Sequence, residues 1–176
     1  MNGLLAKALM TRPVTIDAPA PDADALAELA NALAKHSRRL LGRSLTIREV
    51  DAGSCNGCEL EIHALGNAFY DVERFGIKFT ASPKHADVLL VTGPVTHNMK
   101  FALQRAYDVM PDPKWVVAVG DCAANCGVFA GSYACAGAVA DVIPVDLHIK
   151  GCPPQPIDML KGLLALLETV SKRKFA

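Results

Sequence analysis

The chain has 176 residues, of which 51% are hydrophobic, enough for one domain with an appended segment. Its 18 basic and 18 acidic side chains cancel, so it offers no general electrostatic attraction for nucleic acid. No apolar run approaches the roughly 20 residues that cross a membrane, and the N-terminus has no secretory signal. We therefore expect a cytoplasmic chain whose 6 cysteines stay reduced and serve in ligation or catalysis.

The first 43 residues are expected to form an arm, a linker and a docking helix outside the main domain. Residues 1–14 predict a short amphipathic arm, and residues 15–24 predict a linker rich in proline, alanine and aspartate. A helix is predicted over residues 24–41, because leucines recur along one side of it, and Gly42 ends it. The last part of this helix is basic. Its apolar face must be covered, and we expect it to dock the chain onto a membrane-embedded partner.

Residues 44–176 predict an α/β domain. Strands alternate with helices, which is typical of a parallel sheet covered by helices. The predicted strands are residues 45–50, 76–80, 87–91, 114–119 and 142–145, and the predicted helices are residues 58–70, 98–110 and 154–172. Ligands of such sheets bind at the carboxyl ends of the strands.

Four cysteines lie in the loops of this predicted sheet. Cys55 and Cys58 form a Cys-x-x-Cys pair after the first strand, and Cys122 follows the fourth strand. Cys152 lies in Gly-Cys-Pro-Pro before the last helix. Four thiolates at one end of a sheet can hold a Zn²⁺ ion or a [4Fe–4S] cluster. Structural zinc sites usually use two close pairs, whereas this chain has one pair and two single cysteines, which favours the cluster.

Glycines accompany each of these cysteines in the sequence. A glycine lets backbone amides approach sulfur, and hydrogen bonds from such amides raise the reduction potential of a cluster. The glycines concerned are Gly53, Gly57, Gly120 and Gly151.

The other candidates in the same loops have simpler interpretations. Cys126 and Cys135 are expected to be buried apolar residues, although Cys126 is the alternative ligand in the loop after the fourth strand. His63 is expected to be a packing or hydrogen-bonding residue of the following helix. Glu59 and Glu61 are expected to be solvated or to lie at an interface.

Several motifs resemble one family. Residues 53–62 (Gly-Ser-Cys-Asn-Gly-Cys-Glu-Leu-Glu-Ile) are similar to the proximal-cluster motif in the small subunits of membrane-bound, energy-conserving [NiFe] hydrogenases of the formate hydrogenlyase type. Four further segments match in the same order, namely residues 71–77, 82–87, 92–96 and 151–154. The family also includes the 20 kDa iron–sulfur subunit of complex I, which usually has two adjacent cysteines where this chain has a spaced pair. The spaced pair therefore indicates the hydrogenase side of the family.

The resemblance implies a flavodoxin-like fold without FMN and one [4Fe–4S] cluster held by Cys55, Cys58, Cys122 and Cys152. It implies that the cluster lies near the [NiFe] centre of a separate large subunit and exchanges electrons with a ferredoxin-like subunit. The chain itself would be a non-catalytic electron-transfer subunit of an oxidoreductase. Membrane-embedded partners would hold it peripherally on the cytoplasmic side of the inner membrane.

Three alternatives remain open at this stage. The chain could carry the cluster of a quinone-reducing, complex I-like enzyme, which quinone-dependent activity would reveal. It could be a zinc-stabilised binding module with no redox role, which metal analysis would reveal. An FMN-binding flavodoxin is disfavoured, because the loop after the first strand has cysteines where a phosphate site needs hydroxyl-bearing residues.

Overall fold

The computed structural model describes residues 23–175. The arm predicted over residues 1–14 and nearly all of the predicted linker lie outside the described residues. The division of the chain at residue 43 remains a prediction.

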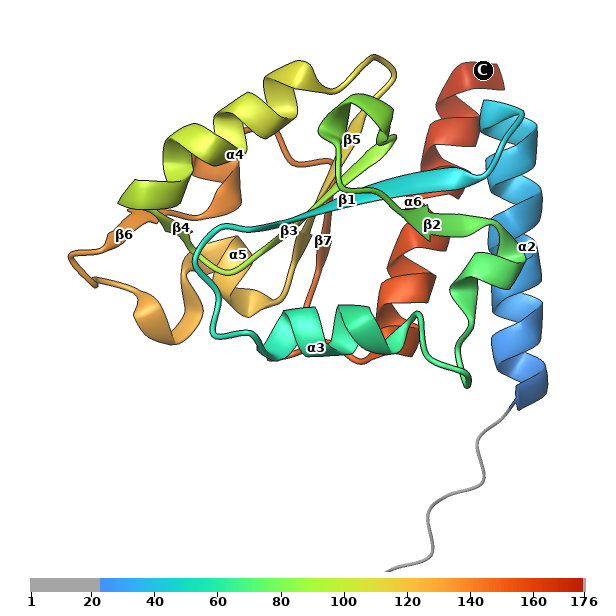
Figure 1. Cartoon of the computed structure of the whole chain (residues 1–176), viewed down its shortest axis with the longest axis horizontal. Coiled ribbons are helices and arrows are strands. Elements are labelled where there is room, and N and C mark those ends of the chain that lie inside the picture. Colours follow the sequence, from blue (N-terminus) through green and yellow to red (C-terminus); the bar gives the residue numbers. More distant parts are fainter. Residues whose placement is uncertain (1–22, 176) are drawn as a thin grey trace, which may run out of the picture.

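Five parallel strands form the central sheet, in the order β2-β1-β3-β5-β7 (Figure 1). They are β1 (Leu45–Asp51), β2 (Ile77–Phe79), β3 (Val88–Thr92), β5 (Trp115–Val119) and β7 (Leu147–Ile149). In register, Ile47 of β1 lies opposite Val88 of β3, and Val88 lies opposite Trp115 of β5. The predicted parallel α/β sheet is confirmed, and the strand order is that of the flavodoxin-like fold.

Helices cover both faces of the sheet, and short 3₁₀ turns connect several elements. The α-helices are α2 (Ala23–Leu41), α3 (Gly57–Ala64), α4 (His97–Val109), α5 (Asp121–Asn125) and α6 (Pro156–Phe175). The 3₁₀ turns are η1 (Val72–Phe75), η2 (Pro83–His85), η3 (Gly127–Phe129) and η4 (Val139–Asp141). None of the helices within residues 23–175 is long and apolar enough to cross a membrane.

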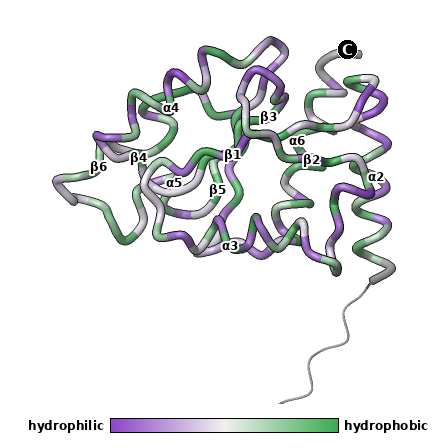
Figure 2. Tube along the Cα trace, viewed as in Figure 1, coloured by the Kyte–Doolittle hydropathy of each residue, from purple (hydrophilic) through white to green (hydrophobic). Residues whose placement is uncertain are grey.

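The central strand β3 is buried along its whole length because each of its faces packs against a separate core. Val88 and Leu90 point into the core that includes leucines of α2 and α6. Leu89 and Val91 point into the opposite core, which includes Leu103 of α4. This alternation explains why β3 has a continuous apolar sequence, which Figure 2 shows as hydrophobic colouring.

The apolar stripe of α2 packs inside the protein. Leu26, Leu33 and Leu40 are buried in the same core as leucines of α6, and the two helices lie side by side (Figure 1). The helix ends as predicted at Gly42, which has a φ of 71° and whose N–H donates to the carbonyl of Arg38 (2.9 Å). The stripe is therefore covered by the protein's own core. Docking through α2, which remains a prediction, would have to use its exposed polar face.

The predicted fifth strand is wrong. Instead of residues 142–145, the strand is β7, which begins at Leu147. Ile143 is buried in the core beside α4, and Pro144 has no N–H to donate to a sheet. Asp146 makes the first connection to β5, because its N–H donates to the Val116 carbonyl and its carboxylate accepts from the Val116 N–H (2.9 and 2.8 Å).

Element ends and short elements also differ from expectation. The helix predicted over residues 58–70 ends at Ala64, because the side chain of Asn67 accepts the N–H groups of Phe69 and Tyr70 (2.8 and 3.0 Å) and forms a turn. The last helix begins at Pro156 instead of residue 154. The structure adds α5 and a two-stranded antiparallel pair, β4 (Val95–Thr96) and β6 (Cys135–Gly137).

Candidate metal centre

The first cysteine loop joins the carboxyl end of β1 to α3. The Asp51 carboxylate accepts the N–H groups of Gly53 and Ser54 (both 2.7 Å), which turns the chain away from the sheet. Cys55 then lies exposed in the loop, and Cys58 lies half-buried in the first turn of α3.

Hydrogen bonds hold the second and third cysteine loops together. The Gly120 N–H donates to the carbonyl of Ile149 at the end of β7 (2.8 Å). The Asp121 N–H donates to the carbonyl of Gly151, and the Gly151 N–H donates back to the Asp121 carboxylate (2.9 and 3.0 Å). These bonds place Cys122, which is buried in α5, next to the loop that carries the exposed Cys152.

The three loops enclose a cavity of about 100 Å³. Its lining residues are Ser54, Cys55, Gly57, Cys58, Gly93, Asp121, Cys122, Gly151, Cys152 and Pro153. All four cysteines predicted as ligands therefore lie at one site, although they come from distant parts of the sequence. A volume of this size exceeds several-fold the roughly 10–15 Å³ needed for one water molecule, so the cavity has room for a group of several atoms.

Glycine backbone packs directly against three of the sulfurs. A Cβ built on Gly120 would lie 2.7 Å from the Cys58 Sγ, and one on Gly57 would lie 3.6 Å from the Cys55 Sγ. A Cβ on Gly127, which the sequence did not single out, would lie 2.8 Å from the Cys122 Sγ. Two of the glycines named from the sequence, Gly57 and Gly120, therefore lie close to sulfur atoms. Gly151 lines the cavity beside its neighbour Cys152, whereas a Cβ built on Gly53 would meet Thr96 and Pro94. The approach of backbone amides to sulfur at these glycines remains a prediction.

The protein offers little positive charge to the four sulfurs. Burial, together with the charges of Glu59 and of the other three cysteines at the cavity, raises the pKa of Cys58 to about 12. Burial and the charge of Cys152 raise the pKa of Cys122, whereas a hydrogen bond from the backbone of Val128 lowers it. No lysine or arginine is among the described residues that line the cavity. Thiolates gathered here therefore need a positively charged group among them, as a bound metal provides.

Glu59 is a buried acid directly beside the site. Its residue is 7% exposed, and neither carboxylate oxygen has a hydrogen-bond partner within residues 23–175. Burial and the charge of Glu59 raise the pKa of the neighbouring Glu49. The expectation of a solvated Glu59 is wrong, whereas its expected place at an interface remains a prediction.

The two remaining cysteines do not line the cavity, and both are only half-buried, so the expectation that they are buried is wrong. Cys126 is the left-handed residue after α5, with a φ of 67°, and it is absent from the cavity lining. Burial raises its pKa, and the charges that act on it are those of Cys135 and Asp141, not those of the four cavity cysteines. His63 is exposed on α3 and faces a groove with Glu49 instead of the cysteine cavity.

The structure adds Gly93 and Asp121 to the residues predicted at the site, besides the backbone N–H of Val128. Asp121 directly precedes a predicted ligand, and Gly93 lies in residues 92–96, one of the segments that carry the family resemblance. Within residues 23–175, no group of three or more His, Cys, Asp or Glu side chains has the close spacing of ligands around a single metal ion.

Comparisons with known proteins identify the class. The family model for "NADH ubiquinone oxidoreductase, 20 Kd subunit" matches residues 55–166. The chain is 44% identical over 134 residues to the probable membrane-bound hydrogenase subunit mbhJ of Pyrococcus furiosus, covering 76% of this chain and 80% of that protein. It is 41% identical over 159 residues to formate hydrogenlyase subunit 7 of Escherichia coli, covering 89% of this chain and 58% of that protein.

Three further comparisons extend the set. A subunit of the F(420)H(2) dehydrogenase of Methanosarcina mazei is 44% identical over 117 residues, which are 66% of this chain and 64% of that protein. A chain in the structure of the membrane-bound sulfane sulfur reductase, an archaeal respiratory membrane complex, aligns with a TM-score of 0.66 and 35% identity over 80% of this chain and 76% of that one. A chain of an NAD+-reducing [NiFe]-hydrogenase aligns with a TM-score of 0.57 and 19% identity over 72% of this chain and 93% of that one, which supports the fold alone.

These comparisons place the chain in the class that contains subunits of membrane-bound hydrogenases and of complex I-like oxidoreductases. It belongs to the family of the complex I 20 kDa subunit, and the resemblance predicted from its motifs is confirmed. The chain spans less than two thirds of the length of two of the three curated relatives that it matches.

Proposed function

We propose that this chain is the electron-transfer subunit of a membrane-associated [NiFe] hydrogenase and that it holds one [4Fe–4S] cluster. Cys55, Cys58, Cys122 and Cys152 would be the four ligands. The observation that carries the proposal is that three loops from the carboxyl ends of parallel strands bring these four cysteines to one cavity of about 100 Å³. When bound, such a cluster supplies one-electron transfer chemistry.

The donor set and the space fit this group. Four cysteine sulfurs are the usual ligands of a [4Fe–4S] cluster. A single zinc ion would also accept four sulfurs, but the cavity with its close-packed glycines leaves room among the sulfurs for a larger group. The family match and the hydrogenase relatives support the cluster over zinc.

The chain's own residues would position and tune the site. Gly57, Gly120 and Gly127 let the backbone lie against the sulfurs, which excludes water from that side. The Val128 N–H donates to the Cys122 sulfur and favours its thiolate, and such hydrogen bonds raise a cluster's reduction potential. Burial of Cys58 and Cys122 keeps two ligands inside the protein, whereas Cys55 and Cys152 lie at the exposed rim.

The exposed rim is the side at which we place the catalytic partner. Segments next to the cysteine loops expose Leu60 (62%), Val128 (84%) and Tyr133 (97%). Apolar side chains exposed around a redox site are typical of a protein interface. We propose that the [NiFe] large subunit covers them, and that a ferredoxin-like subunit exchanges electrons with the pair. Membrane-embedded subunits would hold the assembly at the cytoplasmic side of the inner membrane, and this chain would make no nickel centre of its own.

One alternative function rests on the same relatives. The family description and the F(420)H(2) dehydrogenase relative also fit a cluster-bearing subunit of a quinone-reducing, complex I-like enzyme. Quinone-dependent activity of the native complex that carries this chain, in the absence of hydrogen uptake or evolution, would favour that alternative.

Metal and sulfide analysis of the native complex tests the cluster. We expect about four irons and four acid-labile sulfides in this subunit. Replacing any one of the four cavity cysteines with alanine should abolish or convert the electron paramagnetic resonance signal of the reduced cluster. One zinc without sulfide would refute the redox function, and loss of the signal in Cys126→Ala but not in Cys122→Ala would refute the ligand assignment.

A further inference from the structure

We propose that a basic pocket beside the amino ends of β1 and β3 binds the phosphate of anionic phospholipid headgroups. The proposal extends the proposed function, because it assumes a subunit that works at a membrane. The basic pocket is an open concavity of about 500 Å³. Its lining residues are Arg43, Thr46, Lys78, Phe79, Thr80, Lys84, His85 and Pro111.

Three separate segments bring basic side chains to this pocket. Arg43 lies between α2 and β1, Lys78 lies in β2 at the edge of the sheet, and Lys84 and His85 lie in η2. Lys78, Lys84 and His85 are exposed. Neither Lys78 nor Lys84 forms an ion pair with an acid in the described part of the chain. Their two charges are therefore available to an anion from outside.

Arg43 is held in place by a buried acid. Its two terminal nitrogens donate to the Asp87 carboxylate (2.9 and 2.6 Å), which also accepts the Thr46 N–H (2.9 Å). Asp87 is 3% exposed, whereas the Arg43 side chain is 54% exposed. Asp87 thus fixes the guanidinium plane, and the N–H groups that face outward can donate to an oxyanion. A guanidinium has five N–H donors and suits phosphate oxygens.

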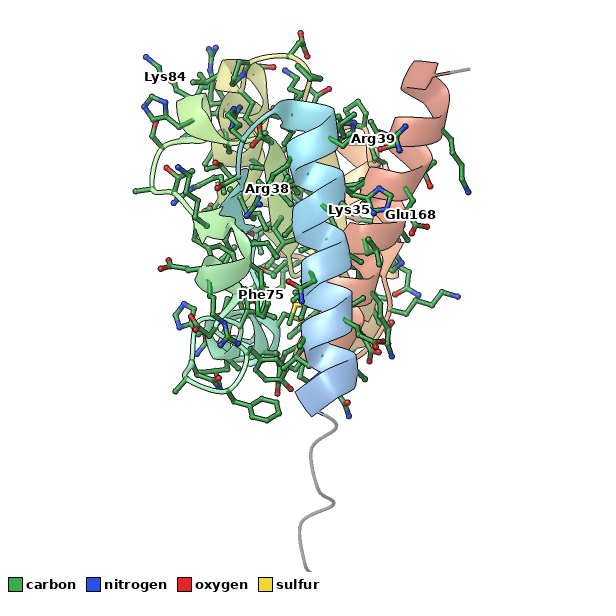
Figure 3. The ribbon with its side chains drawn as sticks, turned by 90° about the vertical axis from the view of Figure 1, so that its right-hand side faces the viewer. Lys35, Arg38, Arg39, Phe75, Lys84 and Glu168 are labelled. Atoms are coloured by element: carbon green, nitrogen blue, oxygen red, sulfur yellow. The ribbon has the colours of Figure 1, made fainter. Side chains whose placement is uncertain are left out.

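The surroundings of the pocket favour a surface of phosphates over one free anion. Figure 3 shows Lys84, Arg38 and Lys35 in the upper half of the face that α2 presents. Lys35 and Arg38 are exposed, and neither forms an ion pair with a described residue. The acid labelled in this view is Glu168 of α6, which is half-buried and lies 4.0 Å from His36 of α2. Positive charge therefore continues past the pocket onto a helix surface, which matches an extended anionic leaflet better than a single small ion.

The pocket and the cysteine cavity can be used at the same time. β1 begins at Leu45, near the pocket residues Arg43 and Thr46, and ends at Asp51, before the loop of Cys55. The two sites thus lie at opposite ends of the sheet. A lipid at one end would leave the cysteine rim free for a partner protein.

Vesicle flotation tests the proposal with the full-length chain and any soluble subunits that co-purify with it. The wild type should float with vesicles that contain phosphatidylglycerol and not with vesicles of phosphatidylcholine alone. Each basic charge near an anionic surface changes affinity about fivefold, so the variant Lys78→Glu/Lys84→Glu should bind at least about tenfold more weakly. The matched control, Lys100→Glu/Lys161→Glu, makes the same change in net charge on α4 and α6 and should bind like the wild type.

Each other outcome overturns the proposal in a distinct way. Equal loss in both double variants would indicate diffuse charge without a site. Saturable binding of inorganic phosphate in calorimetry, with no flotation on anionic vesicles, would indicate a free-anion site. Flotation that survives Lys78→Glu/Lys84→Glu, with loss of a co-purifying subunit, would indicate an acidic protein partner. Iron and sulfide content is measured in every variant, so failure of the proposed cluster is recognised separately from failure of lipid binding.

Discussion

Replacing Gly120 with alanine perturbs the cysteine cavity at one point. Gly120 follows β5 and is buried, with a φ of 86° and a ψ of 160°, a conformation open almost only to glycine. The new Cβ would lie 2.7 Å from the Cys58 Sγ and 3.4 Å from the Gly151 carbonyl oxygen. The peptide cannot rotate freely to relieve this contact, because its N–H donates to the Ile149 carbonyl (2.8 Å).

Two costs follow from this geometry. Backbone strain in this region is about 1–3 kcal/mol for a residue with a side chain. The short contact is relieved without moving the backbone only if the Cys58 side chain rotates, and rotation moves its sulfur from its place at the cavity. We therefore expect Gly120→Ala to lower the free energy of unfolding by about 1–3 kcal/mol and to lose most of its iron.

A second glycine separates strain from the effect on sulfur. Gly131 also has a positive φ, of 80°, but nothing lies within 4 Å of a Cβ built on it. Gly131→Ala should lower stability by about 1–2 kcal/mol and keep its full iron and sulfide. Denaturant unfolding gives the stabilities, and metal analysis with electron paramagnetic resonance gives the cluster content. Full iron and an unchanged resonance signal in Gly120→Ala would refute the reasoning that Gly120 positions the Cys58 sulfur.

Four further substitutions address the charges and thiols around the cavity. Cys126→Ala and Cys135→Ala should keep full iron and sulfide in metal analysis, because neither residue lines the cavity, and iron loss in either would show that a ligand is missing from the set. Burial and the charge of Glu59 raise the pKa of Glu49 above 4.5, so the folded state binds the Glu49 proton more tightly than the unfolded state does. The free energy of unfolding should therefore fall as pH rises from about 4.5 through the raised pKa. Glu49→Gln should make this fall smaller, as measured by denaturant unfolding at several pH values. Glu59→Leu removes a buried carboxylate that lacks hydrogen bonds among the described residues and should raise the free energy of unfolding by about 1–3 kcal/mol, whereas a loss of stability would show that the carboxylate has a favourable partner.

The positions of the four cysteines at one site follow from a simple property of parallel sheets. Each of the loops after β1, β5 and β7 leaves the same edge of the sheet, so cysteines far apart in sequence must come close together. The apolar strands β3 and β5 and the leucine stripe of α2 were equally plain in the sequence, because burial on each face requires them. The sequence of an apolar helix face does not indicate which other surface packs against it. For this reason an external partner was expected where α6 provides the contact.

The details missed from sequence depend on single backbone hydrogen bonds. β7 is a short strand whose start is set by the exchange between Asp146 and Val116, and no periodicity extends over so few residues. The same holds for the turn at Asn67, which ends α3 early. Gly127 and Val128 reach Cys122 only because α5 stops after five residues, at the left-handed Cys126.

The basic pocket and the cysteine cavity differ in the charges that line them, which affects the electrostatic environment of the four sulfurs. Arg43, Lys78 and Lys84 line the basic pocket, whereas no described lysine or arginine lines the cysteine cavity at the carboxyl ends of the strands. One favourable contribution to a thiolate at the cavity is the backbone N–H of Val128, which lowers the pKa of Cys122 and follows Gly127, a residue packed against the Cys122 sulfur. Backbone N–H groups keep their dipoles at every pH, whereas a lysine would add a full charge that salt screens. Substitutions that move the backbone near Gly120 and Gly127 should consequently shift the properties of the bound group more than exchanges of distant surface charges.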